Sequence, residues 1–226
     1  MNAGRDAFRK LVKARPEVRR GEIIGSTLNS GNHFNVLLAG IACMMTRNEQ
    51  GDRQIYAFHY PGDFLGLHGF LYPESAEHIE VEALSTCSVG TIERHALERA
   101  MQDHPELAQV LWRAAMSEAG ILRQRLVMSR WPAQQRVAHL LCEQLARLGP
   151  RASVIPLNQI EVADAVGLSV VHTNRRLQDL RSLGVLADKR SIEVLNKKRL
   201  RELAAFDGRY LEPGEALLRW DLCFDD

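Results

Sequence analysis

The chain has 226 residues, and its 29 lysines and arginines nearly balance 28 acidic residues, leaving a formal net charge of +1. This length allows two modest domains, and the composition of 46% hydrophobic and 25% charged residues is typical of globular proteins. No apolar run approaches the ~20 residues that cross a bilayer, and the N-terminus lacks an apolar signal segment. We therefore expect a cytoplasmic protein with no membrane partner. Its four scattered cysteines, without a CxxC pair, indicate neither a disulfide framework nor a zinc site.

Short apolar segments alternate with turn residues between about residues 23 and 92. Gly51 and the Pro61-Gly62-Asp63 group occur at the spacing expected of turns between antiparallel strands. Regular short strands of this kind predict a β-sandwich or a jelly roll.

A long helix is predicted next, with Asp103 as its N-cap and Pro105 in its first turn. By helical spacing alone, its apolar stripe could belong either to the core of the chain or to an interface. Trp131-Pro132 interrupts the helical pattern and predicts a hinge, after which a further helix ends at Gly149-Pro150. The apolar stripe consists of Leu111, Ala114, Ile121 and Met128.

Residues 157–186 have the pattern of two short helices joined by a tight turn. Asn158, with a glutamate three residues later, has the spacing of a capping box. Gly167 can adopt the left-handed conformation that the turn requires, and Ser169 is a good N-cap for the second helix. Gly184 is expected to end that helix. The layout is typical of a helix-turn-helix, whose second helix enters the major groove of DNA.

The charge of residues 169–201 supports this interpretation. Nine basic and three acidic residues give the segment a net charge of +6, although the whole chain is nearly neutral. A locally basic segment is expected where a protein contacts phosphates. The basic residues are Arg175, Arg176, Arg181, Lys189, Arg190, Lys197, Lys198, Arg199 and Arg201, and the acidic residues are Asp179, Asp188 and Glu193.

The segment AGIACMMTRNEQGDRQIYAFHYPGDFLGLHGFL resembles the β-roll of the CRP/FNR superfamily of bacterial transcription regulators, including the element Gly62-Asp63-Phe64-x-Gly66. The resemblance continues through the helix-turn-helix and covers nearly the whole chain. It implies an α+β fold with a jelly-roll β-roll sensor domain at residues 1–102 and a long dimerisation helix at residues 103–130. A winged helix-turn-helix with a C-terminal extension would occupy residues 131–226. No role is assigned to the tail from Phe206 onward.

The resemblance also locates candidate residues for an effector pocket. Cyclic-nucleotide members bind their ligand with a Gly-Glu pair after this element and an Arg-Ser pair about ten residues later. Here Leu67 replaces the glutamate, while Glu77 and His78 replace the arginine and serine, so we expect no cyclic AMP binding. The candidate positions are Gly66, Leu67, His68, Gly69, Glu77, His78, Leu122 and Arg123.

No cofactor is expected. The oxygen-sensing branch of the family holds an iron–sulfur cluster with cysteines near its N-terminus, whereas the first cysteine here is Cys43. His68 lies near the haem-ligand position of the carbon-monoxide-sensing branch, but the companion cysteine is replaced by Gly66. We therefore expect neither an iron–sulfur cluster nor haem, and we interpret His68 as a polar residue that lines the β-roll.

The resemblance assigns Val170, Val171 and Arg175 to the three base-reading positions of the recognition helix. Arginine can read guanine O6 and N7, whereas valine can contact a thymine methyl group but cannot hydrogen-bond a base. Thr173, Leu177 and Leu180 should face the core of the domain. Further DNA contacts are expected from Ser169, His172 and Asn174 and, in a β wing after the helix, from Lys189 and Arg190.

The sequence thus predicts a homodimeric, DNA-binding transcription regulator that acts on palindromic double-stranded DNA, with RNA polymerase as a candidate partner. The apolar stripe of the long helix is then the expected dimer interface. The alternative is a binding module for a cyclic nucleotide or another small ligand, without DNA function. An enzyme is disfavoured because no nucleophile elbow, P-loop or metal triad is present.

Overall fold

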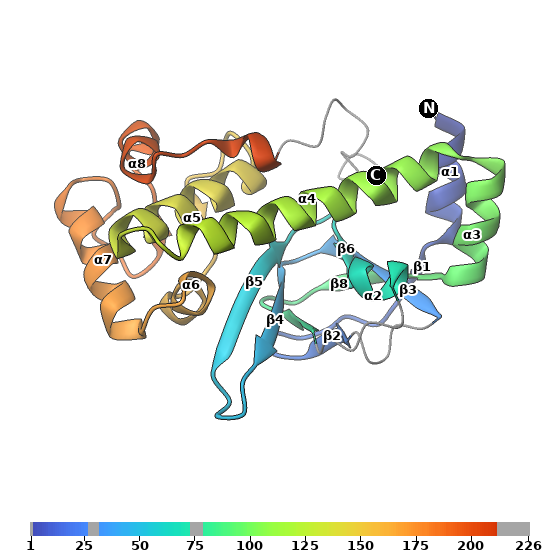
Figure 1. Ribbon diagram of the computed structural model, residues 1–226, viewed down its shortest axis with the longest axis horizontal. Helices are drawn as coiled ribbons and strands as arrows, with labels where there is room; N and C mark the ends of the chain where they lie inside the picture. The colour runs from blue at the N-terminus through green and yellow to red at the C-terminus, as the bar shows by residue number, and fades with distance from the viewer. Residues whose placement is uncertain (1, 27–31, 73–78, 212–226) are drawn as a thin grey trace. The chain divides into compact units, whose positions relative to one another are not determined.

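The computed structural model describes residues 2–26, 32–72 and 79–211. The chain divides into two compact units (Figure 1). Among the described residues, the first comprises those up to Gly51 together with Ala57–Ala119, and the second comprises Asp52–Tyr56 and Gly120 to Leu211. The boundary falls within the long helix α4 (Glu106–Met128), which therefore contributes to both units.

Two four-stranded sheets form the β-roll of the first unit, in the strand orders β1-β8-β3-β6 and β2-β7-β4-β5. The pairs β1–β8, β3–β8, β2–β7 and β4–β7 are antiparallel, as the turn-separated apolar segments predict. The strands are β1 (Lys13–Ala14), β2 (Ile23–Ser26), β3 (His33–Ala39), β4 (Ala42–Arg47), β5 (Arg53–His59), β6 (Phe64–Leu65), β7 (Glu80–Ala83) and β8 (Ser88–Glu93).

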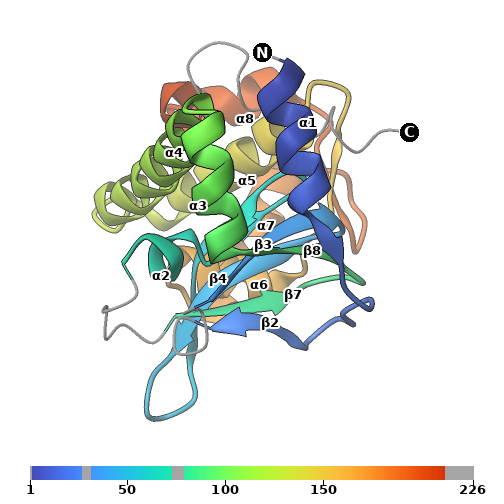
Figure 2. The ribbon, with the colours of Figure 1, turned by 90° about the vertical axis from the view of Figure 1, so that its right-hand side faces the viewer.

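Helices cover the first sheet and complete its core. They are α1 (Asn2–Leu11), α2 (Leu67–Leu71), α3 (Arg94–Asp103) and the N-terminal part of α4, and α1 and α3 lie side by side (Figure 2). Phe34 of β3 packs against Phe64 and Phe70, with ring centroids 4.8 and 4.9 Å apart. A separate cluster between the sheets includes Leu37, Val81 and Val89. The jelly-roll prediction is confirmed.

The long helix differs from its predicted form in two ways. It begins at Glu106, because Asp103 is the last residue of α3 and His104 leaves the helical conformation. The prediction that Leu111, Ile121 and Met128 form a dimer interface is wrong, because these side chains are buried within the chain itself. Ala114, the fourth residue of that stripe, packs against the core cluster of the first unit.

The second unit is a helical domain with a small two-stranded sheet. Its elements are α5 (Ala133–Leu148), β9 (Val154–Ile155), α6 (Gln159–Val166), α7 (Val170–Ser182), β10 (Ile192–Glu193), α8 (Lys197–Ala204) and the 3-10 helix η2 (Gly208–Leu211). Leu140 and Leu141 of α5, Leu177 of α7 and Leu200 of α8 are fully buried and form much of its core. Arg53 belongs to this unit, and its Nε donates to Asp164 Oδ2 on α6 at 2.7 Å. In the described part of the chain, no helix is long and apolar enough to span a membrane.

His139 lies in the interior of the second unit with only 1% of its surface exposed. Its ring packs against the rings of Phe206, Tyr210 and Trp131, with centroid separations of 5.0, 6.0 and 5.2 Å, and only the Tyr210 ring is stacked on it. Burial lowers the pKa of His139 from 6.5 to about 4, with a smaller effect of the Arg125 charge in the same direction and an opposing effect of Glu143.

This low pKa predicts acid-sensitive folding. Between pH 6.5 and about 4 the unfolded chain binds a proton at His139 that the folded chain excludes. The stability contributed by neutral His139 is therefore complete above pH 6.5 and falls as the pH decreases toward 4, by at most about 1.4 kcal/mol per pH unit. Urea unfolding across this pH range should show a shallower pH dependence for His139→Gln than for the wild type. His95→Gln, at an exposed position, should retain the wild-type slope, and identical slopes for all three proteins would contradict the assignment.

Candidate nucleic-acid interface

Helix α6 begins with the capping box that the sequence predicts. Asn158 Oδ1 accepts hydrogen bonds from the N–H groups of Ile160 and Glu161, both at 2.9 Å. The Glu161 carboxylate in return accepts from the Asn158 N–H at 2.8 Å. Val162, Ala163 and Val166 are buried, whereas Ile160, which shares their helical spacing, is exposed. The hydrogen bonds of the capping box satisfy backbone donors that the first turn of a helix leaves unpaired.

The turn between α6 and α7 depends on Gly167. This residue has φ 62° and ψ 48°, a left-handed conformation that costs glycine nothing, and its N–H donates to Ala163 O. Ser169 then caps α7, since its Oγ accepts from the His172 N–H at 3.2 Å. The helix ends at Ser182, and Gly184 has φ 67°, as expected of a glycine that follows a helix. The predicted helix-turn-helix is therefore formed.

Helix α7 presents an exposed face made of the predicted recognition residues. Val171 is 63% exposed and Val170 is 38% exposed, while His172 and Arg175 are also exposed. The Asn174 side chain is only partly exposed, and its buried Oδ1 has no hydrogen-bond partner within the part of the chain that the structure describes. The prediction that Thr173, Leu177 and Leu180 face the core is confirmed, because all three are fully buried. The opposite surface of α7 is thus free to enter a groove of DNA.

Sequence reasoning missed Gln178, which is exposed three residues after Arg175. That spacing places the two side chains on the same face of α7. An amide side chain can make paired hydrogen bonds to adenine, so Gln178 extends the candidate base-reading surface. Its spacing of about one helical turn from Arg175 would have indicated this position from the sequence.

The wing, residues 186–194, packs next to the recognition helix. Leu186 and Val194 form an isolated antiparallel bridge, and β10 pairs with β9, which precedes α6 in the chain. Arg181 of α7 holds this turn in place by donating to the carbonyl oxygens of Ala187 at 3.3 Å and Lys189 at 3.0 Å. Arg181, which the sequence suggested as one of several phosphate-binding cations, is thus a structural residue of the wing.

The remaining cations differ in how far their charge is already neutralised. Lys189 lies 2.7 Å from the Glu193 carboxylate. Arg176 lies 3.1 Å from Asp179, and Arg199 lies 3.0 Å from Glu202. Within residues 2–26, 32–72 and 79–211, no hydrogen bond or ion pair engages the side chains of Arg175, Arg190 and Lys198. These three cations are therefore the most available for phosphate or base contacts.

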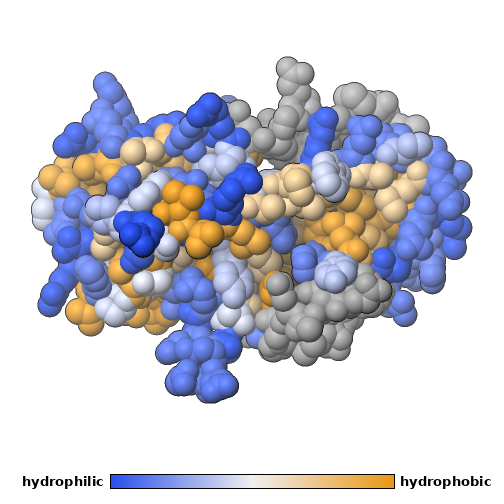
Figure 3. Space-filling view, in the orientation of Figure 1, coloured by the Kyte–Doolittle hydropathy of each residue, from blue (hydrophilic) through white to orange (hydrophobic). Residues whose placement is uncertain are grey.

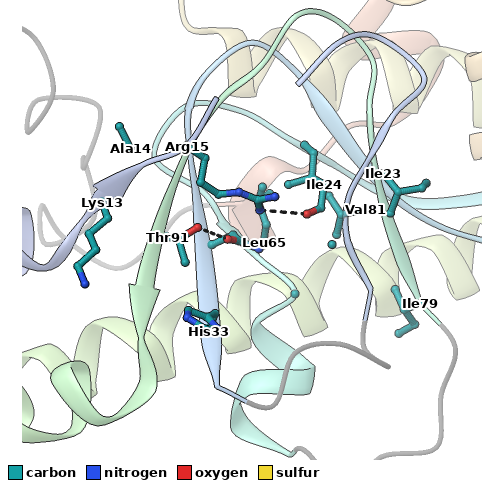
Figure 4. A pocket seen from close by; sticks show the side chains of 13 residues that line it. Lys13, Ala14, Arg15, Ile23, Ile24, His33, Leu65, Ile79, Val81 and Thr91 are labelled. Carbon is teal, nitrogen blue, oxygen red and sulfur yellow. Dashed lines mark hydrogen bonds between the residues drawn. The ribbon is translucent and has the colours of Figure 1, made fainter. Parts of the chain in front are cut away.

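The first unit contains a cavity of about 700 Å³ between its two sheets (Figure 4). One part of its lining is polar, with Lys13, Arg15 and His33, and Arg15 Nη1 donates to Ile24 O at 3.3 Å. Thr91 Oγ1 donates to Asn35 Oδ1 at 2.9 Å on the same wall. The apolar lining consists mainly of Ile23, Ile24, Leu65, Ile79 and Val81, with Ala14 beside them. This volume is that of a site for a small organic molecule.

The predicted effector residues do not form this cavity as a group. Gly66 lines the cavity, whereas Leu67 and Gly69 are buried residues of α2 that do not line it. The partly exposed His68 packs edge-on against Tyr72 at 6.2 Å and does not line the cavity. Leu122 and Arg123 lie on the exposed surface of α4, in the second unit. The two remaining candidates, Glu77 and His78, lie outside the described residues.

Among the residues that the structure describes, no group of three or more His, Cys, Asp or Glu side chains is arranged to hold a metal ion. Cys43 and Cys87 are buried in the β-roll and Cys142 is buried in α5, where burial raises its thiol pKa to about 12.

Comparisons with known proteins agree with both units. A model of the Crp-like helix-turn-helix domain matches residues 135–203, and a model of the cyclic nucleotide-binding domain matches residues 15–104. The nitrogen fixation regulation protein FixK of Azorhizobium caulinodans is 29% identical over 80% of this chain and 74% of its own length. The transcriptional activator protein FnrL of Cereibacter sphaeroides is 28% identical over 76% of this chain and 72% of its own.

A solved structure shows the same architecture. FixK2 from Bradyrhizobium japonicum has a TM-score of 0.74 and 26% sequence identity, and the match covers 87% of this chain and 98% of that one. By their names, FixK is a regulation protein and FnrL is a transcriptional activator. With a β-roll that matches one domain model and an exposed recognition helix within the other, the chain belongs to the CRP/FNR superfamily of DNA-binding transcription regulators.

Proposed function

We propose that the protein acts as a homodimer in the cytoplasm, reads a palindromic operator through α7, and controls transcription there in contact with RNA polymerase. The observation that carries the proposal is the exposed α7 face, on which Val170, Val171 and Arg175 project together, Arg175 having no side-chain partner among the described residues. Two such helices related by two-fold symmetry can read half-sites one helical turn apart.

Dimerisation is supported by a second apolar stripe on α4, which we term the α4 seam. Its residues follow the alternating four- and three-residue steps of a coiled-coil interface and are exposed or only partly buried in the single chain. Trp112 is 65% exposed and Leu126 is 74% exposed, and Figure 3 shows apolar atoms gathered over α4. A twin helix would remove this surface from water. The α4 seam consists of Ala108, Trp112, Ala115, Ala119, Leu122 and Leu126.

A charge placed in the α4 seam should therefore dissociate the dimer. Ala119→Glu would bring two carboxylates together across the two-fold axis, and we expect the dimer dissociation constant to rise at least tenfold. Sedimentation equilibrium would measure this constant. Val127→Glu adds the same charge at an exposed position of α4 outside the seam and is the matched control. A fully dimeric Ala119→Glu protein would contradict the proposed interface.

Base reading by Arg175 predicts a sequence-dependent loss of affinity. Arg175→Ala should weaken binding to the preferred operator by a factor of about 10 to 100, which corresponds to one lost bidentate contact of about 1–3 kcal/mol. Binding to a scrambled duplex should change little. The operator would first be selected from a random duplex pool, and both affinities would be measured over a salt series.

The wing provides the matched control. Arg190 is exposed and unpaired in the described part of the chain, so Arg190→Ala should remove a phosphate contact. Because such a contact carries no sequence information, both duplexes should weaken alike and the slope of log K against log salt should fall by about one unit. Equal losses on operator and scrambled DNA for Arg175→Ala would leave that residue as a phosphate contact only.

We further propose the β-roll cavity as the site of an effector other than cyclic AMP. Leu67 stands where cyclic-nucleotide members carry a glutamate, and its side chain is buried in the core cluster of the first unit. Neither an iron–sulfur cluster nor haem is proposed, because Cys43, Cys87 and Cys142 are buried at separated positions and Gly66 cannot act as a ligand side chain.

Cyclic AMP should accordingly leave the protein unchanged. We expect no saturable heat of binding by calorimetry at micromolar concentrations and an operator affinity that is the same with and without the nucleotide. The physical reason is that Glu77 and His78 stand where cyclic-nucleotide members carry the arginine and serine that hold the cyclic phosphate. Saturable binding coupled to a change in operator affinity would show that another group replaces that arginine.

A further inference from the structure

We propose that residues Phe206–Leu211, which follow α8, form a strap that fixes the C-terminal half of α4 to the DNA-binding helices, with Tyr210 and Glu143 as positioning residues for operator reading. The inference rests on the proposed function, because it concerns how a dimer built on α4 presents two recognition helices. All the residues involved belong to the second unit.

The strap leaves α8 along a well-defined path. Ala205 adopts a left-handed conformation with φ 46°, which is strained for a residue with a Cβ atom and reverses the chain. The Phe206 N–H then donates to Arg201 O at 3.1 Å, and the Arg201 guanidinium lies over the Phe206 ring at 5.1 Å. At Gly208 a Cβ atom would lie 2.9 Å from the Phe206 ring, so the backbone passes close to that ring.

Aromatic contacts seat the strap on α5. The rings of Phe206 and Tyr210 both pack against His139, and the Tyr210 ring lies within 13° of parallel to the imidazole. Trp131, in the segment between α4 and α5, packs edge-on against the same imidazole at 5.2 Å. His139 therefore joins the strap, α5 and the α4–α5 connection in one aromatic cluster.

Buried polar contacts of Tyr210, Glu143 and Arg125, which we term the polar relay, connect the strap to α4. The Tyr210 hydroxyl donates to Glu143 Oε2 at 2.8 Å, and Glu143 Oε1 forms an ion pair with Arg125 of α4. Gln144 Nε2 also donates to Glu143 Oε1, at 3.2 Å. The Glu143 side chain is 3% exposed, so its charge depends on these partners for the solvation that water would otherwise provide. Arg125 also donates to Tyr56 O at 3.3 Å.

A direct backbone approach gives α4 a second contact with the strap. A Cβ atom at Gly120 would lie 3.3 Å from Tyr210 O, tighter than an ordinary contact. Glycine at this helical position therefore lets the strap lie close to α4, about one and a half turns before Arg125. The strap thus contacts α4 through Gly120 and, by way of Glu143, through Arg125.

The arrangement has a consequence for DNA reading. The α4 seam includes Leu122 and Leu126, which lie in the same half of the helix that the strap holds. In a dimer joined at this seam, the strap restricts the orientation of α7 relative to the two-fold axis. A restricted orientation favours binding to one half-site spacing. If the DNA-binding domain were loose, it would lose conformational entropy on binding the correct operator, and it would also bind operators with other spacings.

The test is half-site spacing discrimination by Tyr210→Phe. This change keeps the ring against His139 but removes the donor to Glu143. We expect affinity for the operator to fall about tenfold, and affinity for a duplex with one base pair inserted between the half-sites to change less. The affinity ratio between these duplexes should therefore fall severalfold. Glu143→Gln and Gly120→Val, which disturb the relay and the backbone approach separately, should behave in the same way.

Asp207→Asn is the control within the strap. Asp207 is exposed and pairs only with Arg209 among the described residues, so its variant should keep the wild-type spacing ratio. Light scattering and thermal melting would accompany each measurement. If Tyr210→Phe does not fold, Gly120→Val and Glu143→Gln provide the same readout.

The outcomes separate the inference from the proposed function. A wild-type protein that is monomeric, or that does not bind a palindromic operator, contradicts the proposed function. A dimeric wild type whose relay variants melt at a lower temperature but retain the wild-type spacing ratio overturns the strap, since its contacts would then serve stability alone. A reduced spacing ratio in the relay variants, with dimerisation intact, supports it.

Discussion

Helix α4 carries two apolar stripes that are offset by one residue, and a stable assembly must remove both of them from water. One stripe, which includes Leu107, Leu111 and Ile121, is buried within the chain. The other includes Trp112 and Leu126 and stays exposed in the single chain. A helix that is apolar on two sides needs two partners, and the second partner we propose is a copy of itself.

The DNA-binding unit shows how backbone geometry and charge cooperate. The capping box at Asn158 and the left-handed Gly167 determine where one helix ends and the next begins. Leu177 and Leu180 then bury one side of α7, and so Val171 and Arg175 face outward. The basic character of this region is less uniform than its composition implies, because several cations already have carboxylate or carbonyl partners. The cations without such partners among the described residues are therefore the ones that we propose for DNA contacts.

Buried polar groups in the second unit connect its outer elements. A carboxylate as buried as that of Glu143 is tolerated only with close partners, and it obtains them from α4, α5 and the strap. Neutral His139 next to it holds three aromatic rings around one imidazole. The same contacts that stabilise this interior therefore also restrict how the recognition helix is oriented on α4.

Local patterns were sufficient to predict the strand-rich first part and the helix-turn-helix with its caps, since each depends on spacing within a few residues of the chain. The core positions of α7 and the base-reading position of Arg175 came from the resemblance to the family. The sequence could not decide which stripe of α4 is buried, because two stripes one residue apart have equal periodicity. Only the packing of the rest of the chain against α4 distinguishes them. Nor could it identify the strap. Tyr210 and Glu143 are 67 positions apart, and only the tertiary fold brings a hydroxyl and a carboxylate so distant in sequence within hydrogen-bond distance.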